Sequence, residues 1–97
     1  MIADLMSELT GFSVPRLPRG VRLHFDKVRN AHVLLAPERA FNVDERAVIV
    51  LKLVDGVHTI SAIAATLAAQ FTADPVVIER DVTAMLADLV GKRVVEA

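Results

Sequence analysis

The fold is decided by residues 21–43, which read VRLHFDKVRNAHVLLAPERAFNV. Val21, Leu23 and Phe25 alternate with charged or polar residues, and this period of two is typical of a half-buried β-strand. Apolar residues resume at 31–36, which indicates a second strand returning beside the first. The segment therefore predicts a β-hairpin.

A three-residue loop at 28–30 brings the apolar residues of this hairpin together better than a two-residue turn does. Its last position is an asparagine, which tolerates the left-handed conformation that closes such a loop. The resulting register places Phe25 opposite Val33 and Leu23 opposite Leu35. We therefore expect Val33 and Leu35 to share the face of the second strand that points to the core.

A third short strand is expected at 40–43, because Pro37 and Glu38 break the second strand. By the same period of two, Phe41 and Val43 should point from it to the core. The sheet then has three short strands.

Three helices are expected after the strands, at 45–54, 60–71 and 75–90. Each follows a residue that is a good helix N-cap, namely Asp44, Thr59 and Asp74. Glycine at 56 and 91 and proline at 75 agree with these ends. The expected buried residues are Ala47 to Leu51 in the first helix, Ile60, Ile63, Ala64, Leu67 and Phe71 in the second, and Ile78, Val82, Met85, Leu86 and Leu89 in the third. A short extended tail can follow at Val94 and Val95.

The chain divides into an N-terminal arm, 1–13, and a single domain, 14–97. The arm carries one apolar helical stripe, formed by Ile2, Leu5, Met6 and Leu9. A helix this short is marginal in water by itself. The arm is therefore expected either as a packed helix or as a disordered or partner-docked segment, with neither favoured.

Composition excludes several classes of protein. The 97 residues include no Cys, so disulfides, iron–sulfur clusters and thiolate metal ligands or nucleophiles are absent. The net charge of −1 provides no overall positive field for a polyanion. No apolar run is long enough to span a membrane and no signal peptide is visible, so we expect a cytoplasmic protein with no membrane contact.

Cations gather near the start of the domain. Residues 15–29 hold five cations and one anion, for a local net charge of +4. A run of charge is most often a solvated face. The other interpretation is a basic flank that docks on an acidic partner, formed by Arg16, Arg19, Arg22 and Arg29.

Catalytic and metal chemistry find little support in the sequence. The three histidines, at 24, 32 and 58, match no metal-binding spacing, and no nucleotide-binding or hydrolase motif is present. In the expected register Asp26 faces His32 across the hairpin, and two such groups are too few for a metal site. We therefore expect no metal, no cofactor and no enzyme activity of the chain alone.

Short strands followed by three helices can form a winged-helix arrangement, a fold that often binds DNA. The third helix, 75–90, would then read the major groove. It carries Glu79, Asp81 and Asp88 against Arg80 alone, and phosphate repels an acidic helix. Nucleic-acid binding is therefore disfavoured, although it stays one alternative.

Several motifs follow one another along the chain: VPRLPRGVRL at 14–23, FD at 25–26, Arg29, LLAPE at 34–38, DG at 55–56, and the helical rows Ile60…Ile63…Leu67 and Ile78…Asp81-Val82…Leu86…Leu89. In this order and spacing they resemble the PqqD family, the small proteins of pyrroloquinoline quinone biosynthesis. The resemblance covers 14–95. An aromatic residue is usual in the family where this chain has His32.

The resemblance implies an α+β, winged-helix-like fold with a three-stranded antiparallel sheet followed by three helices. It also implies a non-catalytic peptide chaperone, which binds a ribosomally made precursor peptide (PqqA-like) and presents it to a radical S-adenosylmethionine enzyme (PqqE-like). In similar domains the peptide adds as a strand beside the third strand and packs on the third helix. Carried onto this chain, the contact residues are Ala40, Phe41, Asn42 and Val43 on the strand and Val77, Arg80, Asp81 and Ala84 on the helix.

A dimerisation module is the remaining alternative, in which the free strand edge pairs with a second copy. Such a homodimer is compatible with peptide binding, because it would hide the same edge. In a peptide chaperone, the basic flank is expected to dock on the modifying enzyme or on the acidic part of the peptide.

Overall fold

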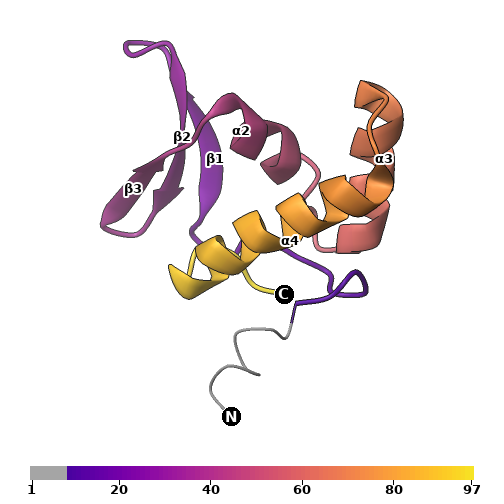
Figure 1. Ribbon diagram of the computed structural model, residues 1–97. Helices are drawn as coiled ribbons and strands as arrows, with labels where there is room; N and C mark the ends of the chain where they lie inside the picture. The colour runs from indigo at the N-terminus through magenta and orange to yellow at the C-terminus, as the bar shows by residue number, and fades with distance from the viewer. Residues whose placement is uncertain (1–8) are drawn as a thin grey trace.

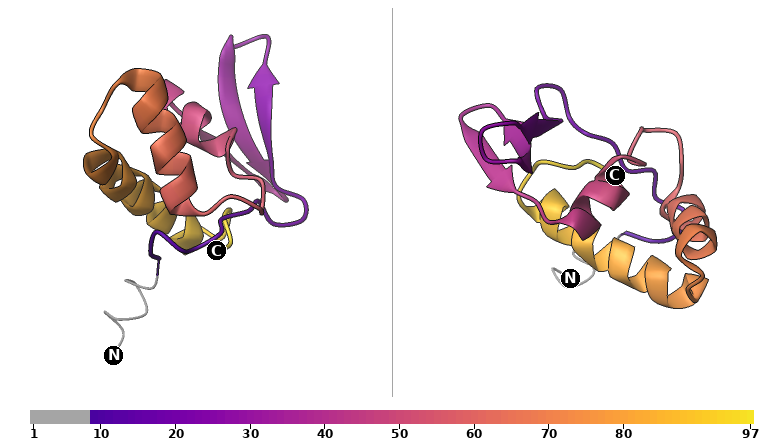
Figure 2. Two further views of the ribbon diagram at one scale, coloured as in Figure 1. Left: turned by 90° about the vertical axis from the view of Figure 1, so that its right-hand side faces the viewer. Right: turned by 90° about the horizontal axis from the view of Figure 1, so that it is seen from above.

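The computed structural model describes residues 9–97, and Figure 1 shows the arrangement of their elements. Three strands, β1 (Arg22–Asp26), β2 (Ala31–Ala36) and β3 (Arg39–Asn42), precede three helices, α2 (Glu45–Leu51), α3 (Ile60–Phe71) and α4 (Pro75–Gly91). The strands are antiparallel in the order β1-β2-β3, and the helices lie on one side of the sheet (Figure 2). The expected fold class is confirmed.

Side chains cap all three helices at the predicted residues, Asp44, Thr59 and Asp74. The backbone N–H groups that they accept from belong to Ala47, Ala62 and Val76, respectively. The first helix is shorter than predicted and ends at Leu51. The N–H groups of the next two apolar residues, Leu53 and Val54, bind carbonyls three residues back, so the chain continues as a tight turn.

The predicted buried faces of α3 and α4 are right except for Phe71, which is 54% exposed. Phe71 is the last residue of α3, and Thr72 then adopts a left-handed φ of 52° that turns the chain toward α4. The last turn of α3 therefore extends beyond the core. In α4, Val82, Leu86 and Leu89 are buried, and Ile78 and Met85 pack against them half-buried.

The β1–β2 connection has four residues, 27–30, so the predicted three-residue loop is wrong. The Asp26 carboxylate accepts hydrogen bonds from the N–H groups of Val28 and Arg29, which organises the loop directly after β1. The left-handed conformation predicted for Asn30 is confirmed, with φ 53°.

This longer loop moves the register of the hairpin by one residue. Leu23 lies opposite Leu34, not opposite Leu35, and Phe25 lies opposite His32. A shift of one residue brings the other face of a strand to the core. Leu34 is accordingly fully buried and belongs to the core cluster, whereas Val33, also buried, lies on the opposite face of β2.

The C-terminal tail returns into the core. Val94 and Val95 are buried, and Glu96 then exchanges two backbone hydrogen bonds with Arg16, of 2.7 and 2.9 Å. The tail therefore pairs with the segment that leads into the sheet and not with β3.

Residues 9–13 lie along the start of α3. The carbonyls of Gly11 and Ser13 accept hydrogen bonds from the N–H groups of Ser61 and Ile60, each of 2.9 Å. These bonds satisfy donors in the first turn of α3, which have no partner inside the helix. The rest of the predicted apolar stripe, at positions 2, 5 and 6, lies outside the described residues.

Within residues 9–97, no helix has the length and apolar character that crossing a bilayer requires.

Candidate functional site

β3 is an edge strand, and no other strand of residues 9–97 pairs with its outer side. It follows a two-residue turn, 37–38, so the flanking residues Ala36 and Arg39 form a hydrogen-bonded pair. Such pairs alternate along an antiparallel ladder. The N–H and C=O groups of Ala40 and Asn42 therefore point away from β2 and can receive a further strand.

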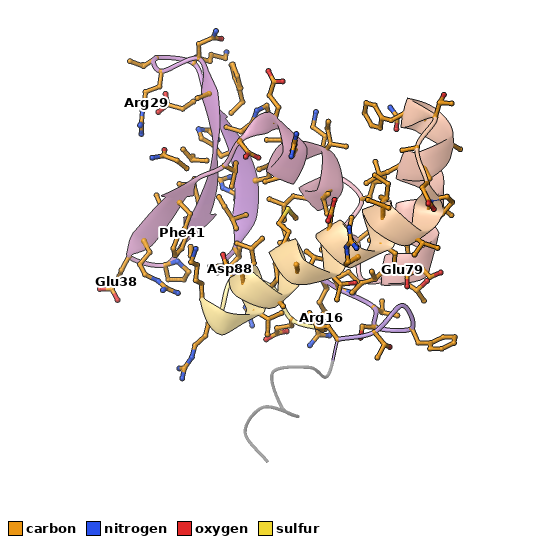
Figure 3. The ribbon with its side chains drawn as sticks, viewed as in Figure 1. Arg16, Arg29, Glu38, Phe41, Glu79 and Asp88 are labelled. Atoms are coloured by element: carbon orange, nitrogen blue, oxygen red, sulfur yellow. The ribbon has the colours of Figure 1, made fainter. Side chains whose placement is uncertain are left out.

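Arg39 links β3 to the C-terminal end of α4. Its side chain lies on the same face as that of Phe41, because residues two apart in a strand point the same way. Its Nη2 donates to the Lys92 carbonyl at 2.9 Å, and its guanidinium carbon lies 5.2 Å from the centre of the Phe41 ring. Lys92 also pairs with Asp88 of α4, at 2.9 Å. Figure 3 shows Phe41 and Asp88 at this end of the molecule.

The exposed residues of α4 form one continuous face opposite the buried row, and the two sides of this face border that row. Residues three or four apart share a side of a helix. Val77, Asp81 and Asp88 lie along one side of this face, and Asp88 pairs with Lys92, whose carbonyl accepts the bond from Arg39 of β3.

A shallow hollow of about 530 Å³ lies on the other side of α4, where residues 9–11 pass. Gly11 packs closely there, since a Cβ at this position would come 3.0 Å from Oε2 of Glu79. The α4 residues that line the hollow are Val76, Glu79, Arg80, Thr83, Ala84 and Ala87. This hollow faces the N-terminal segment and is separate from the edge of β3.

The structure thus divides the residues predicted to bind peptide. On β3, the exposed residues are Ala40 and Asn42, and the half-buried ones that pack against the core are Phe41 and, just after the strand, Val43. On α4, Val77 and Asp81 lie on the side that continues to Asp88 and Lys92, whereas Arg80 and Ala84 line the hollow. Sequence reasoning missed Arg39, although the period of two that placed Phe41 on the core face places Arg39 there too.

The four arginines of the predicted basic flank do not gather in one patch. Arg16 lies near the C-terminus and pairs with Glu96 at 2.8 Å, whereas Arg29 lies at the far tip of the β1–β2 hairpin (Figure 3). Arg19 and Arg22 are exposed between them, before and at the start of β1.

Two of the three histidines have contacts, His32 in packing and His58 in a turn. His32 lies against Phe25, with ring centres 5.0 Å apart, so the prediction that Asp26 faces His32 is wrong. Asp26 faces Ala31 instead, because of the longer loop. Among residues 9–97, no three His, Asp or Glu side chains come close enough together to hold a metal ion.

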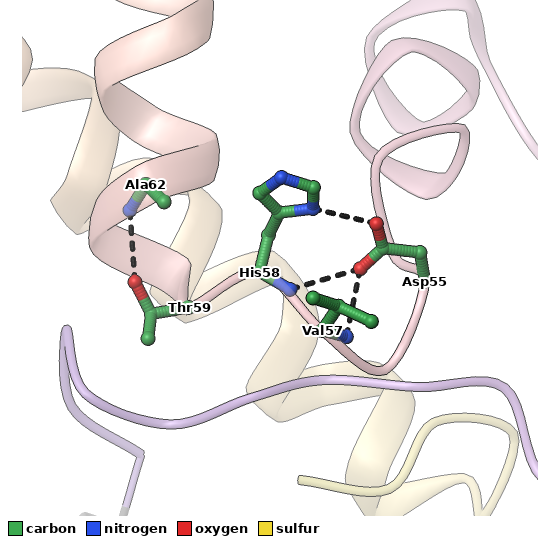
Figure 4. Close-up of polar contacts among 5 residues, drawn as sticks. All are labelled: Asp55, Val57, His58, Thr59 and Ala62. Atoms are coloured by element: carbon green, nitrogen blue, oxygen red, sulfur yellow. Dashed lines mark hydrogen bonds and ion pairs between the residues drawn. The ribbon is translucent and has the colours of Figure 1, made fainter.

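A polar turn precedes α3 (Figure 4). The Asp55 carboxylate accepts from the N–H groups of His58 and Val57 and contacts Nδ1 of His58. These bonds, from His58 first and Val57 next, lower the pKa of Asp55 to about 2. The carboxylate therefore stays ionised to a lower pH than an ordinary Asp, and its hydrogen bonds hold the turn that leads to the Thr59 cap.

The chain is similar to proteins of coenzyme PQQ synthesis. The family model of coenzyme PQQ synthesis protein D (PqqD) matches residues 31–95. The bifunctional coenzyme PQQ synthesis protein C/D of Methylorubrum extorquens is 62% identical over 97 residues, and the match covers 97% of this chain and 26% of that protein. The chain thus spans about a quarter of this relative.

Two further similarities cover more than three quarters of shorter proteins. The PqqA binding protein of Rhodopseudomonas palustris (strain TIE-1) is 51% identical over 80 residues, which is 82% of this chain and 78% of that protein. The solution NMR structure of the PqqD truncation of Methylobacterium extorquens PqqCD, a stand-alone recognition element for ribosomally synthesised and post-translationally modified peptides, has a TM-score of 0.82 and 59% identity. That match covers 95% of this chain and 98% of that structure.

Proposed function

The chain belongs to the PqqD family, and on this premise we propose that it binds a PqqA precursor peptide without catalysing a reaction itself. The observation that carries the proposal is the free edge of β3, where the N–H and C=O groups of Ala40 and Asn42 are open. An extended peptide can complete this edge with main-chain hydrogen bonds, which demand little of its sequence. Selectivity would come from its side chains that meet α4.

The second step of the proposal is that the bound peptide is presented to a PqqE-like radical S-adenosylmethionine enzyme. A peptide added to β3 would keep one edge free and one face exposed, so another protein could reach it. The Methylorubrum relative is a bifunctional synthesis protein C/D, in which a PqqD part and a second synthesis protein form one chain. This fusion supports the proposal that the domain acts next to other proteins of the same pathway.

A titration with a synthetic PqqA peptide tests the binding step. We expect the amide NMR signals of Arg39–Asn42 and of the α4 side formed by Val77, Asp81 and Asp88 to change most. Changes concentrated on residues 59–71 of α3 would place the peptide elsewhere and contradict the proposed site. No change at any residue would contradict peptide binding.

The two sides of α4 can be distinguished by a matched pair of substitutions. Val77→Glu should weaken PqqA binding about thirtyfold, because the peptide would cover an unpaired charge. Val76→Glu places the same charge on the side of the hollow and should change affinity by less than about threefold. Both positions lie in the first turn of α4, where an acidic residue is favourable, so both variants should fold.

Isothermal titration calorimetry with PqqA gives the two affinities. If both variants weaken PqqA binding equally, the loss comes from added negative charge anywhere at the start of α4 and not from contact at Val77. A Val77→Glu variant that binds like the parent would remove this side of the helix from the peptide site.

The exposed arginines before, in and after β1, namely Arg19, Arg22 and Arg29, are proposed to dock the modifying enzyme over an extended surface, whereas Arg16 is paired with Glu96. Replacing these three by Gln should weaken the complex with a PqqE-like enzyme several-fold at low salt. The difference should vanish at about 0.5 M salt, because screening acts within about 10 Å already at 0.1 M. Arg16→Gln is the control. A parent complex of equal affinity at both salt concentrations would leave the flank as a solvated face.

The free edge of β3 also supports a second role, pairing with a second copy of the chain. A dimer formed in this way should dissociate as PqqA is added, since both occupy one edge. Sedimentation velocity with and without the peptide measures this, and a dimer that PqqA leaves intact would use another surface.

A further inference from the structure

The C-terminal end of α4 presents carbonyl groups that have no partner inside the helix. The Lys92 carbonyl, at the cap of this helix, accepts a hydrogen bond of 2.9 Å from Nη2 of Arg39. Positive charge at this end is also favoured by the helix dipole. A side chain of β3 therefore takes the place that water would occupy at the end of α4.

The Arg39 guanidinium is held from a second direction as well. Its carbon lies 5.2 Å from the centre of the Phe41 ring, within the range of a cation–π contact. Phe41 itself packs against the core, and Lys92 is tied back to α4 through Asp88 at 2.9 Å. Arg39 thus lies between a fixed side chain of the sheet and a fixed helix end.

The two ends of β3 are attached to the domain in different ways. After Asn42 the chain continues into Val43, which packs against the core, and Asp44, which caps α2. The other end follows the exposed turn 37–38. Among the described residues, the bond from Arg39 to Lys92 is the only hydrogen bond that joins β3 to the end of α4.

We propose that Arg39 is a positioning residue, which holds the start of β3 at a set distance from α4 and so prepares the edge for the peptide. It acts through Lys92 and Phe41 and need not touch the peptide. A site that is ordered before binding loses less conformational freedom when the ligand arrives. This inference rests on the proposed function, because the edge is prepared for a PqqA peptide.

The test compares Arg39→Met, Arg39→Lys and a matched control, Arg46→Met, by calorimetric titration with synthetic PqqA. Methionine keeps length but removes the donor and the charge, and we expect affinity about tenfold lower for Arg39→Met. Lysine keeps a charged donor and should recover most of that loss. Arg46 is exposed in the first turn of α2, outside the proposed sites, so Arg46→Met should bind like the parent.

Amide NMR supplies a readout that a general loss of stability would not move. The Lys92 carbonyl belongs to the same peptide unit as the Arg93 N–H, so the Arg93 amide signal should shift in free Arg39→Met and return in Arg39→Lys. An Arg93 signal that does not shift in Arg39→Met would overturn the proposal. If the parent binds PqqA, an Arg39→Met affinity within twofold of the parent's would overturn it too. Arg39→Lys binding as weakly as Arg39→Met would overturn the role of the Lys92 contact. A parent that does not bind PqqA would overturn the proposed function itself.

Discussion

Replacing Asn42 with proline should weaken PqqA binding about a hundredfold and leave the sheet intact. The Asn42 N–H points away from β2, so the donor that proline removes belongs to the added strand and not to the β2–β3 ladder. The proline ring also projects into the space where the peptide backbone would pair. The lost bond and the displaced strand together cost about 3 kcal/mol of binding free energy, or about a hundredfold in affinity.

Asn42→Ala is the matched control, because it removes the side chain but keeps the N–H. It should bind PqqA within about threefold of the parent, as expected for an exposed substitution. Calorimetry measures both affinities, and an amide spectrum shows whether each variant is folded. If folded Asn42→Pro binds like the parent, the peptide does not use this edge; if Asn42→Ala binds as weakly as Asn42→Pro, the side chain carries the effect.

The helix starts could be predicted because helix capping is local. Each capping side chain binds an N–H only two or three residues further on, so the information lies within one turn. The bounds of β2 follow in the same way from its apolar run and from Pro37, whereas β3 runs over Arg39–Asn42 and not over the predicted 40–43. The end of α3 at Phe71 was also predicted, but the burial of Phe71 was not, because its exposure depends on where the core ends and not on its own helix.

The register of the β1–β2 hairpin could not be predicted from the sequence for a related reason. The segment at 31–36, AHVLLA, is apolar on both faces, so its composition fits either face against the core. The choice depends on the loop, where the Asp26 carboxylate binds two N–H groups and makes the connection one residue longer than predicted. Side-chain hydrogen bonding inside the loop thus decided which leucine is buried.

The candidate site was predictable only in outline. The resemblance to PqqD proteins pointed to the third strand and the third helix, and both lie where a peptide beside β3 could contact them. The sequence of α4 does not reveal which of its exposed residues line the hollow, because Val77 and Val76 are equally apolar. That distinction needs the position of a distant segment, residues 9–11.

The register can be tested with two neighbouring leucines of β2. Leu34→Ala should lower the free energy of unfolding by about 3 kcal/mol, because Leu34 is fully buried and its truncation leaves a cavity. Leu35→Ala should cost about 1 kcal/mol, since Leu35 is half-buried on the opposite face. Both variants make the same change in the same strand, so strand propensity is equal and only the face differs.

Urea unfolding followed by circular dichroism gives both values from the midpoints, provided that the slope with denaturant is unchanged. The three-residue loop would place Leu35 opposite Leu23 in the core and would reverse the order of the two losses. A larger loss for Leu35→Ala would therefore contradict the register with Leu23 opposite Leu34. A larger loss for Leu35→Ala would also change the account of β3, because Leu34 lies opposite Phe41 in the observed β2–β3 pairing. A shift of β3 by one residue would move Arg39 and Phe41 to the face of the sheet away from α4.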